Sequence, residues 1–438
     1  MHALMEGAKG SVDQAELYWR RRHTINVLYQ NCRLQQVEEN DLSSVALRVI
    51  DDGRLGSTYG VFPDHGDLLN DARTAARYGD PATFSFAPAA SYPDVRTYDG
   101  QTAELTSQDL IDLCESVKGR IHQELSDIPL TIRCQAEASQ LLVESTEGAA
   151  GEIRATGFGI GFGAPFRGIG TAIFKGAQSI SPFDVDKMLV DEFIEWYRWG
   201  DKTSTPSTGR LPVILAPEVA FLVLLPLLMG VSGDLVSKKT SPLLDRIGQP
   251  IFSEKITVID DALLDGDPNA RPFDDEGVPC GTRTIVENGV LKDYIIDLRS
   301  GAALGRPSNG HGFKTALFGG GTEVSPTPWF ANPVIAPGEE NWRDLVKGLT
   351  EGLLITNGMG FHSGNYPQGQ FAVQAVGYHI VDGKVVGRLD KTMISGNIYE
   401  DLRNVRAVSR EQRRSIVGLL SAGLAPYILV DSLQVAGK

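Results

Sequence analysis

The chain has little cysteine. Four cysteines occur among 438 residues, and they stand far apart, at Cys32, Cys114, Cys134 and Cys280. Because no CxxC pair is present, neither a zinc knuckle nor a dense disulfide framework is predicted. The first fourteen residues also lack the apolar core and the cleavage site of a secretion signal. We therefore expect reduced thiols and a cytoplasmic protein.

The chain is also poor in positive charge. It has 41 Lys and Arg against 55 Asp and Glu, which gives a net charge of −14 and a pI near 5.0. Proteins that bind nucleic acid neutralise phosphates with a basic surface, and this balance is the opposite. A nucleic-acid partner is not expected.

A long hydrophobic run is missing as well. The most apolar stretch, residues 211–231, is interrupted by Pro212, Pro217, Glu218 and Pro226. Its uncharged part, residues 219–231, is too short to cross about 30 Å of hydrocarbon at about 1.5 Å per residue. The sequence predicts a buried core helix here and no membrane partner.

The remaining composition is that of a folded protein of mixed structure. Hydrophobic residues make up 42% and charged residues 22%, and 48 glycines accompany many segments of alternating polarity. These patterns predict an α+β fold, and the length suggests two or three domains. We expect an N-terminal α+β domain over 1–200, a linker over 201–210 and a C-terminal β-rich domain over 211–438.

The expected elements of the N-terminal part alternate between meanders and helices. A first helix is predicted at 15–22 and a hairpin turn at Asp52-Gly53, where positive φ is tolerated. Ser107 is the expected N-cap of the third helix. Strands are predicted at 23–29, 34–38, 44–50, 55–61, 130–137, 140–145, 152–163 and 169–177, and further helices at 67–78, 110–125 and 183–199. Beyond the linker we expect a helix at 342–352 and final strands at 371–381 and 427–435.

Generic motifs of catalysis and cofactor binding do not occur. The chain has no GxGxxG after a strand, no GxxxxGK[ST] and no GxSxG. Gly157, Gly159, Gly161 and Gly163 alternate along one strand instead. On a strand this spacing indicates close packing or a bend, and not a phosphate cradle.

The metal-binding patterns in the sequence are incomplete. Asp265, Asp267, Asn269 and Glu276 match four positions of an EF-hand loop, but Ala270 stands where that loop needs glycine. These side chains are expected to be solvated or turn-forming. No two histidines share a helical face in an HxxxH spacing.

Two histidines lie in Gly-rich loops. His311 follows Asn309 in SNGHGF, and His362 lies in GFHSGN. All three residues are candidates for lining a binding chamber, although an exposed loop histidine without a role is the more common case.

Several C-terminal segments together resemble the TldD/PmbA family, whose second member is also called TldE. They are FDDEGVP at 273–279, then ENG with a following leucine and tyrosine, a Ser-x-Gly loop, GMGFHSGNYPQGQF at 358–371, and TMISGN ending at Asn397. Weaker similarity, including RVIDDGRLGSTYG at 48–60, runs through the N-terminal half.

The resemblance implies a division of labour between two subunits. TldD-like subunits hold zinc with HExxxH on a helix and a late cysteine, and the glutamate acts as general base. Counted back from the shared Gly233-Asp234 pair, the HExxxH positions here are Leu224, Leu225 and Met229, and residues 416–438 contain no cysteine.

The chain is therefore similar to TldE-like subunits. The resemblance implies no metal and no catalytic residue in this chain. It also implies a zinc-bearing TldD-like partner in a cytosolic metallopeptidase complex that cleaves unfolded or small peptides.

Two alternatives stay open. The first is a stand-alone homodimeric protein that binds a peptide or small molecule without cutting it. The second is a metal-free enzyme that uses His311, His362 and the cluster 274–276 as acid and base.

Overall fold

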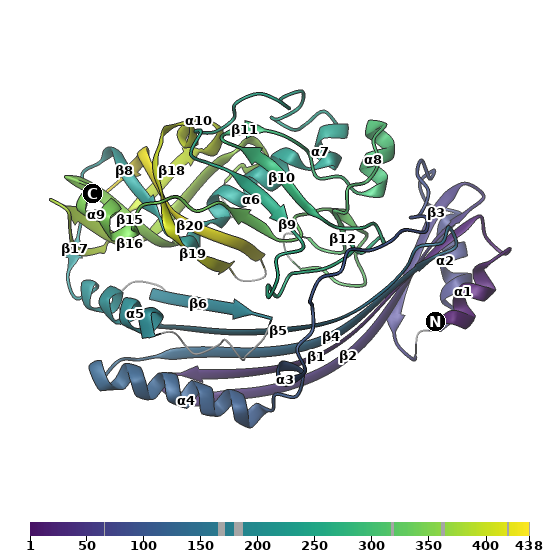
Figure 1. The fold of residues 1–438 in the computed structure, drawn as a ribbon, viewed down its shortest axis with the longest axis horizontal. Coiled ribbons are helices and arrows are strands. Elements are labelled where there is room, and N and C mark those ends of the chain that lie inside the picture. The colour runs from purple at the N-terminus through teal and green to yellow at the C-terminus, as the bar shows by residue number, and fades with distance from the viewer. Residues whose placement is uncertain are drawn as a thin grey trace.

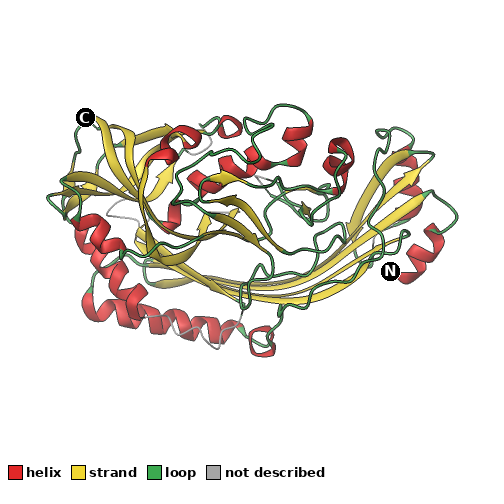
Figure 2. Cartoon of the chain, turned by 45° about the horizontal axis from the view of Figure 1, so that its top comes forward, coloured by secondary structure: helices red, strands yellow, loops and turns green. Residues whose placement is uncertain are grey.

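Two β-sheets dominate the structure, a computed structural model that describes residues 1–64, 66–164, 171–178, 187–316, 319–360, 364–417 and 420–437. One sheet has six strands in the order β3-β2-β1-β4-β5-β6, and the other has twelve. Figure 1 shows the six-stranded sheet as a long arch and the C-terminal sheet and loops lying over it. Helices and strands are mixed along the chain (Figure 2), which confirms the predicted α+β class.

The arch is built from unusually long antiparallel strands. They are β1 (Gln14–Gln30), β2 (Arg33–Asp51), β3 (Arg54–Val61), β4 (Thr131–Ser145), β5 (Ala150–Ala164) and β6 (Thr171–Ala177). The sequence predicted two short strands in place of β2 and two in place of β4, but each is one continuous strand. The polar residues in the middle of each strand lie at exposed or half-buried positions, so they do not interrupt the pairing. β3 pairs only with residues 44–51 of β2, so the exposed half of β2, residues 33–42, pairs with β1 alone among the described strands.

The helix predicted at 15–22 is wrong, because these residues form the first half of β1. Leu17 pairs with Leu47 of β2 on one side and with Glu144 of β4 on the other. Both faces of this half are partly covered, so the polarity does not alternate cleanly and imitates a helical spacing. The hairpin turn at Asp52-Gly53 is confirmed, with φ values of 51° and 68°.

Helices cover both ends of the arch (Figure 1). α1 (His2–Ala8) and α2 (Leu68–Ala76) lie at one end, and α4 (Ser107–Glu124) and α5 (Lys187–Trp199) at the other, with the short α3 (Gly100–Ala103) between them in sequence. The cap of α4 is Thr106 and not Ser107, because Thr106 and Asp109 form a reciprocal capping box. The predicted residues 169–170 and 183–186 lie outside the described residues.

The C-terminal sheet is mixed, in the order β11-β10-β9-β14-β20-β8-β15-β16-β17-β7, with β18 and β19 beside it. Its strands are β7 (Thr203–Ser204), β8 (Gly209–Leu215), β9 (Val258–Asp261), β10 (Thr282–Glu287), β11 (Val290–Leu291), β14 (Pro333–Ile335), β15 (Glu351–Met359), β16 (Gln370–Val381), β17 (Lys384–Leu389), β18 (Met393–Asn397), β19 (Val405–Val417) and β20 (Leu420–Ala436). β12 (Gly312–Phe313) and β13 (Thr327–Pro328) form a separate pair. The expected strands 371–381 and 427–435 fall within β16 and β20.

The segment expected as a linker takes part in this sheet. Thr203 and Ser204 pair in parallel with Arg388 and Leu389 of β17, and β8 begins at Gly209. The segment is therefore anchored by backbone hydrogen bonds, whereas the domain boundary itself stays a prediction.

Short helices connect the C-terminal strands. Within the described residues they are α7 (Gly233–Ser237), α8 (Leu298–Leu304), α9 (Trp342–Lys347), α10 (Ile398–Asp401) and the 3-10 turns Pro217–Val219, Tyr366–Gln368 and Leu402–Asn404. α9 is shorter than the predicted helix 342–352, because Gly348 ends it and Glu351 already starts β15.

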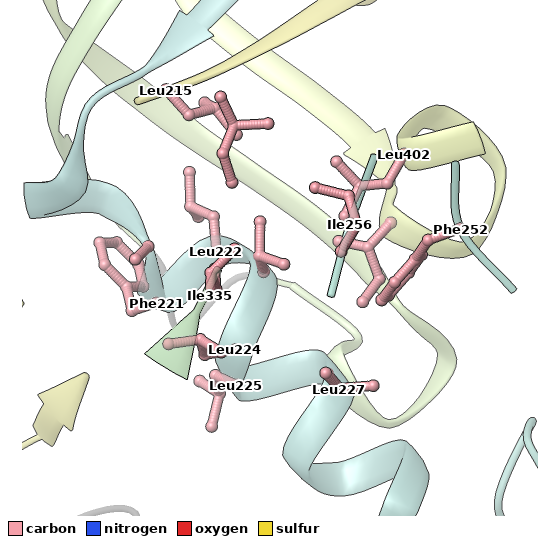
Figure 3. Close-up of a cluster of buried hydrophobic side chains, with 14 of the residues drawn as sticks. Leu215, Phe221, Leu222, Leu224, Leu225, Leu227, Phe252, Ile256, Ile335 and Leu402 are labelled. Carbon is pink, nitrogen blue, oxygen red and sulfur yellow. The ribbon is translucent and has the colours of Figure 1, made fainter. Parts of the chain in front are cut away.

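The apolar run forms the predicted core helix, α6 (Phe221–Val231). Its residues are buried except for Met229, which is half-buried. Figure 3 shows Leu222, Leu224 and Leu225 of this helix in one cluster of buried hydrophobic side chains. No helix in the described ranges has the length and hydropathy needed to cross a bilayer.

Candidate functional site

A cavity of about 390 Å³ lies between the arch and the C-terminal part of the chain. Its arch side comes from β1, β4 and β5, and includes Tyr18, Arg20 and Glu137. The opposite side comes from the loop 268–275, from Ala331 and from Arg414 of β19. Residues from widely separated parts of the sequence thus form a space large enough for a small ligand.

Two glycines lie at the floor of this cavity. Gly157 and Gly159 of β5 both line it, and Ala155 lies on the same face of the strand. A Cβ atom added at Gly157 would lie 3.7 Å from the Cβ of Pro268, an ordinary contact distance. Gly157 and Gly159 thus border the cavity, and close packing of the four alternating glycines stays a prediction.

The cavity wall contains paired charges. The Arg20 Nη2 atom lies 3.0 Å from Glu137 Oε1, and the Arg271 Nη2 atom lies 2.7 Å from Asp275 Oδ1. Asp275 also accepts a hydrogen bond from the backbone N–H of Lys314, at 2.8 Å. Both carboxylates are thus already engaged by donors of this chain.

Arg414 differs from the other two arginines because it is deeply buried, at 6% exposure. Its Nη2 atom forms an ion pair with Asp267 and donates to Asn332 Oδ1 at 3.1 Å. Its Nη1 atom is buried and has no hydrogen-bond partner in the described part of the chain. Burial lowers the pKa of Arg414 to about 10, so the guanidinium is still charged at neutral pH.

Tyr18 adds a phenol to the cavity wall. Burial, and next the negative charge of Asp275, raise the pKa of Tyr18 well above its usual value. The hydroxyl group therefore stays protonated at any physiological pH, and tyrosinate chemistry is not available here.

The FDDEGVP segment holds the two parts of the chain together. Glu276 accepts from Arg48 Nη2 at 3.0 Å and from the backbone N–H of Leu298 at 2.8 Å. Arg48, on β2, also holds Glu16 of β1 through two bonds of 2.8 and 2.7 Å. This buried network joins the arch to the C-terminal part.

Asp274 has a turn-forming role in the same segment. It accepts hydrogen bonds from the backbone N–H groups of Glu276, Val278 and Gly312, at 2.8 to 3.0 Å. Burial raises the pKa of Asp274 to about 7 and that of Glu276 to about 8. Since both side chains are buried and engaged, they have no open approach for a substrate, which weighs against the metal-free enzyme.

His311 is buried and not exposed, contrary to the expectation for a loop histidine. Its Nε2 atom lies 2.8 Å from Asp260 Oδ2, and its Nδ1 atom lies 2.8 Å from Asn309 Oδ1. Asn309 in turn accepts from the backbone N–H of Ile296 at 2.8 Å. Neither residue lines the 390 Å³ cavity, and any contact with a ligand stays a prediction. His362 lies outside the described residues.

The acidic residues of the EF-hand-like stretch form ion pairs with three different arginines and do not converge on one point. Asp265 pairs with Arg96 at 3.3 Å, Asp267 with Arg414, and Glu276 with Arg48. Across the described ranges, no three His, Cys, Asp or Glu side chains are grouped so that they could hold a metal ion.

The positions predicted to correspond to HExxxH, Leu224, Leu225 and Met229, lie on α6. Leu224 and Leu225 are 3% and 4% exposed, within the cluster of Figure 3. Neither side chain has a ligand atom, and Met229 offers only a soft thioether, which zinc sites do not ordinarily use. A zinc ion does not fit these three side chains.

Together, these features define an α+β protein in which an arched antiparallel sheet covers a cavity of ligand size. The chain belongs to the PmbA/TldD/TldE family of metallopeptidase-related proteins. Residues 208–437 match the family described as PmbA/TldA metallopeptidase C-terminal domain, and residues 15–77 match PmbA/TldA metallopeptidase domain 1.

Individual relatives agree with this assignment. A metalloprotease of Methanothermobacter thermautotrophicus is 25% identical over 461 positions, covering 99% of this chain and 98% of its own. A metalloprotease PmbA homolog of Haemophilus influenzae is 29% identical over 53% of this chain and 47% of its own. The crystal structure of TldE from Thermococcus kodakarensis has a TM-score of 0.89 and 22% identity over 100% of both chains, which shows a shared fold.

The cavity residues were missed at the level of the sequence. The alternating glycines were a visible signal, since side chains absent from one strand face leave space there. Arg413 and Arg414 are adjacent and chemically identical in the sequence. Only the tertiary contacts show that Arg414 meets the cavity while Arg413 binds Glu192 and Glu218.

Proposed function

We propose that this chain is the non-catalytic, TldE-like subunit of a metallopeptidase complex that acts on unfolded or small peptides. One observation supports the proposal most strongly: Leu224, Leu225 and Met229, at the predicted HExxxH positions, pack in or against the core. Peptide hydrolysis of this type needs a Lewis acid and a general base at the scissile carbonyl. The zinc and the base therefore belong to a TldD-like partner.

The role of this chain in the complex is architectural. The arched sheet covers a cavity lined by both parts of the chain, and such a surface suits an extended peptide better than a folded protein. We place the complex in the cytoplasm, as the widely spaced thiols predict, and expect a heterodimer in which this chain restricts access to the partner's zinc.

The test is a reconstitution with a TldD-like sibling that carries HExxxH. The mixture should cleave an unstructured peptide faster than the sibling alone, and this chain alone should be inert. Replacing the glutamate of the sibling's motif should abolish the gain. Cleavage by the isolated chain in the presence of a strong chelator would contradict the proposal.

A stand-alone homodimeric binding protein is the second candidate. It is favoured by the cavity itself, which at about 390 Å³ has the size of a small-ligand pocket. Size-exclusion chromatography with and without the sibling separates the two: a new heterodimer peak supports the proposed subunit, and an unchanged homodimer that binds peptide supports the alternative.

A further inference from the structure

His311 is a buried histidine whose two ring nitrogens both face oxygen atoms. The side chain is 3% exposed. Its Nε2 atom lies 2.8 Å from Asp260 Oδ2, and its Nδ1 atom lies 2.8 Å from Asn309 Oδ1 and 3.0 Å from Asn309 O. A neutral imidazole has one N–H and one lone pair, so it can donate on only one of these two sides. On the other side a lone pair would face an oxygen atom.

The orientation of the Asn309 amide is fixed by backbone groups. Its Oδ1 atom accepts from the N–H of Ile296 at 2.8 Å, and its Nδ2 atom donates to the carbonyl oxygen of Tyr294 at 2.8 Å. Turning the amide over would break both bonds. The oxygen end of the amide therefore faces His311, and Nδ1 must carry a proton to donate to it.

Asp260 of β9 likewise presents an acceptor to His311. Its Oδ2 atom accepts from the backbone N–H of Ala331 at 2.8 Å, and its Oδ1 atom accepts from that of Asn332 at 2.6 Å. Asn332 in turn accepts from Arg414 at 3.1 Å, and both Ala331 and Arg414 line the cavity. The carboxylate that faces His311 therefore also holds part of the cavity wall.

We propose that His311, Asp260 and Asn309 form a pH-sensitive contact, the His311 contact, between β9 and the segment 294–296. With both nitrogens protonated, the imidazolium donates to Asp260 and to Asn309 at once. Loss of the Nδ1 proton forces the Asn309 amide to turn over, which releases the segment 294–296. Loss of the Nε2 proton instead leaves a lone pair against the buried carboxylate of Asp260.

The sign of the effect on stability follows from the extra proton of the folded chain. A histidine in an unfolded chain releases its proton near about pH 6.5. The His311 contact therefore stabilises the fold fully below that pH, and its contribution is lost as the pH rises and the proton leaves.

The loop that carries His311 packs against further ionisable groups. Cys280 Sγ donates to the carbonyl oxygen of Gly310 at 3.3 Å, and Asp274 accepts from the N–H of Gly312 at 2.8 Å. Glu276 lies so close to Gly312 that a Cβ atom there would be 2.2 Å from its Oε2 atom. Burial raises the pKa of the Cys280 thiol, so it stays neutral, but it raises that of Asp274 to about 7 and that of Glu276 to about 8. The test must therefore separate His311 from these carboxyl groups.

Hydrogen exchange of two neighbouring backbone amides in the full-length chain tests the proposal. The N–H of Ile296 donates to Asn309 Oδ1, whereas the N–H of Ile295 donates to the carbonyl oxygen of Val231 at 3.0 Å. The ratio of their exchange rates cancels the common effect of hydroxide. We expect the ratio of Ile296 to Ile295 to rise about three- to tenfold between pH 6.5 and 9.5, as loss of one hydrogen bond implies. A constant ratio would overturn the proposal.

Three variants assign the response to its residue. In His311→Gln the side chain no longer titrates, so the ratio should not depend on pH. His23→Gln is the matched control, because His23 also faces a carboxylate, Glu39 Oε1 at 3.6 Å, but its side chain is 36% exposed. This control and Glu276→Gln should both keep the response of the unsubstituted chain. A response that survives in His311→Gln, or that disappears in Glu276→Gln, would contradict the assignment to His311.

Nitrogen NMR of the chain labelled with ¹⁵N-histidine measures the protons directly. At pH 7 both ring nitrogens of His311, identified by the signals that His311→Gln lacks, should have the shifts of N–H groups. A ring nitrogen of His311 without a proton at that pH would overturn the proposal. If His311→Gln does not fold, the exchange ratio of the unsubstituted chain and of Glu276→Gln still decides the outcome.

Discussion

Replacing Arg48 by methionine should uncouple the arch from the C-terminal part of the molecule. Arg48 is 5% exposed and bridges Glu16, at 1% exposure, to Glu276, which is fully buried. Methionine retains most of the side-chain length but leaves two buried carboxylates without their cation. Breaking a buried ion pair from one side costs about 3 to 5 kcal/mol, so we expect a loss of this size in the free energy of unfolding.

Urea denaturation followed by tryptophan fluorescence measures this loss. In the variant Arg48 no longer favours the ionised form of Glu276, so the pKa of Glu276 rises further and the deficit should be smaller at pH 5 than at pH 8. A triple variant, Glu16→Gln, Arg48→Met and Glu276→Gln, should recover part of the stability because no buried charge of this network remains unpaired. A loss under about 1 kcal/mol for Arg48→Met at pH 8 would refute the reasoning.

Three further predictions concern the core helix, pH and zinc. Leu224→Ala or Leu225→Ala should each lower the free energy of unfolding in urea by about 2 to 5 kcal/mol, whereas Met393→Ala, at an exposed position, should change it by under about 0.5 kcal/mol; equal small effects would mean that α6 is not core. The pKa of Glu276 is raised from 4.5 to about 8, so its stabilising contribution is complete below pH 4.5 and is lost as the pH rises through 8. Glu276→Gln should therefore gain stability relative to the unsubstituted chain between pH 5 and 8 in the same assay, and a flat difference would contradict the raised pKa. Elemental analysis of the isolated chain should find no stoichiometric zinc, and one zinc per chain that survives dialysis against a mild chelator would contradict the assignment.

Local sequence patterns predicted the structure correctly where a single effect, either burial or turn geometry, determines it. The run at 221–231 is apolar on every side and is buried on nearly every side, and the Asp52-Gly53 pair forms a tight turn because both residues tolerate positive φ. The resemblance in the C-terminal segments identified the family, which the match over residues 208–437 confirms.

The errors arose where tertiary contacts override local pattern. Residues 15–22 became strand because β1 is paired on both sides, with β2 and with β4. The cavity could not be predicted, since Arg414 is placed by Asp267 and Asn332, which lie far from it in sequence. Nothing in the local sequence distinguishes this arginine from its neighbour.

The exposed half of β2 has a consequence for association of the chain with itself. Strand edges of this kind can pair with another strand and so lead to aggregation. Here the exposed segment carries Glu38, Glu39 and Asp41, together with the apolar Leu34 and Val37. A second copy laid antiparallel along this edge would bring carboxylates of both chains together, and like charges opposite one another destabilise a strand pair. Repulsion between the acidic segments therefore disfavours edge-to-edge pairing of the arches of two copies.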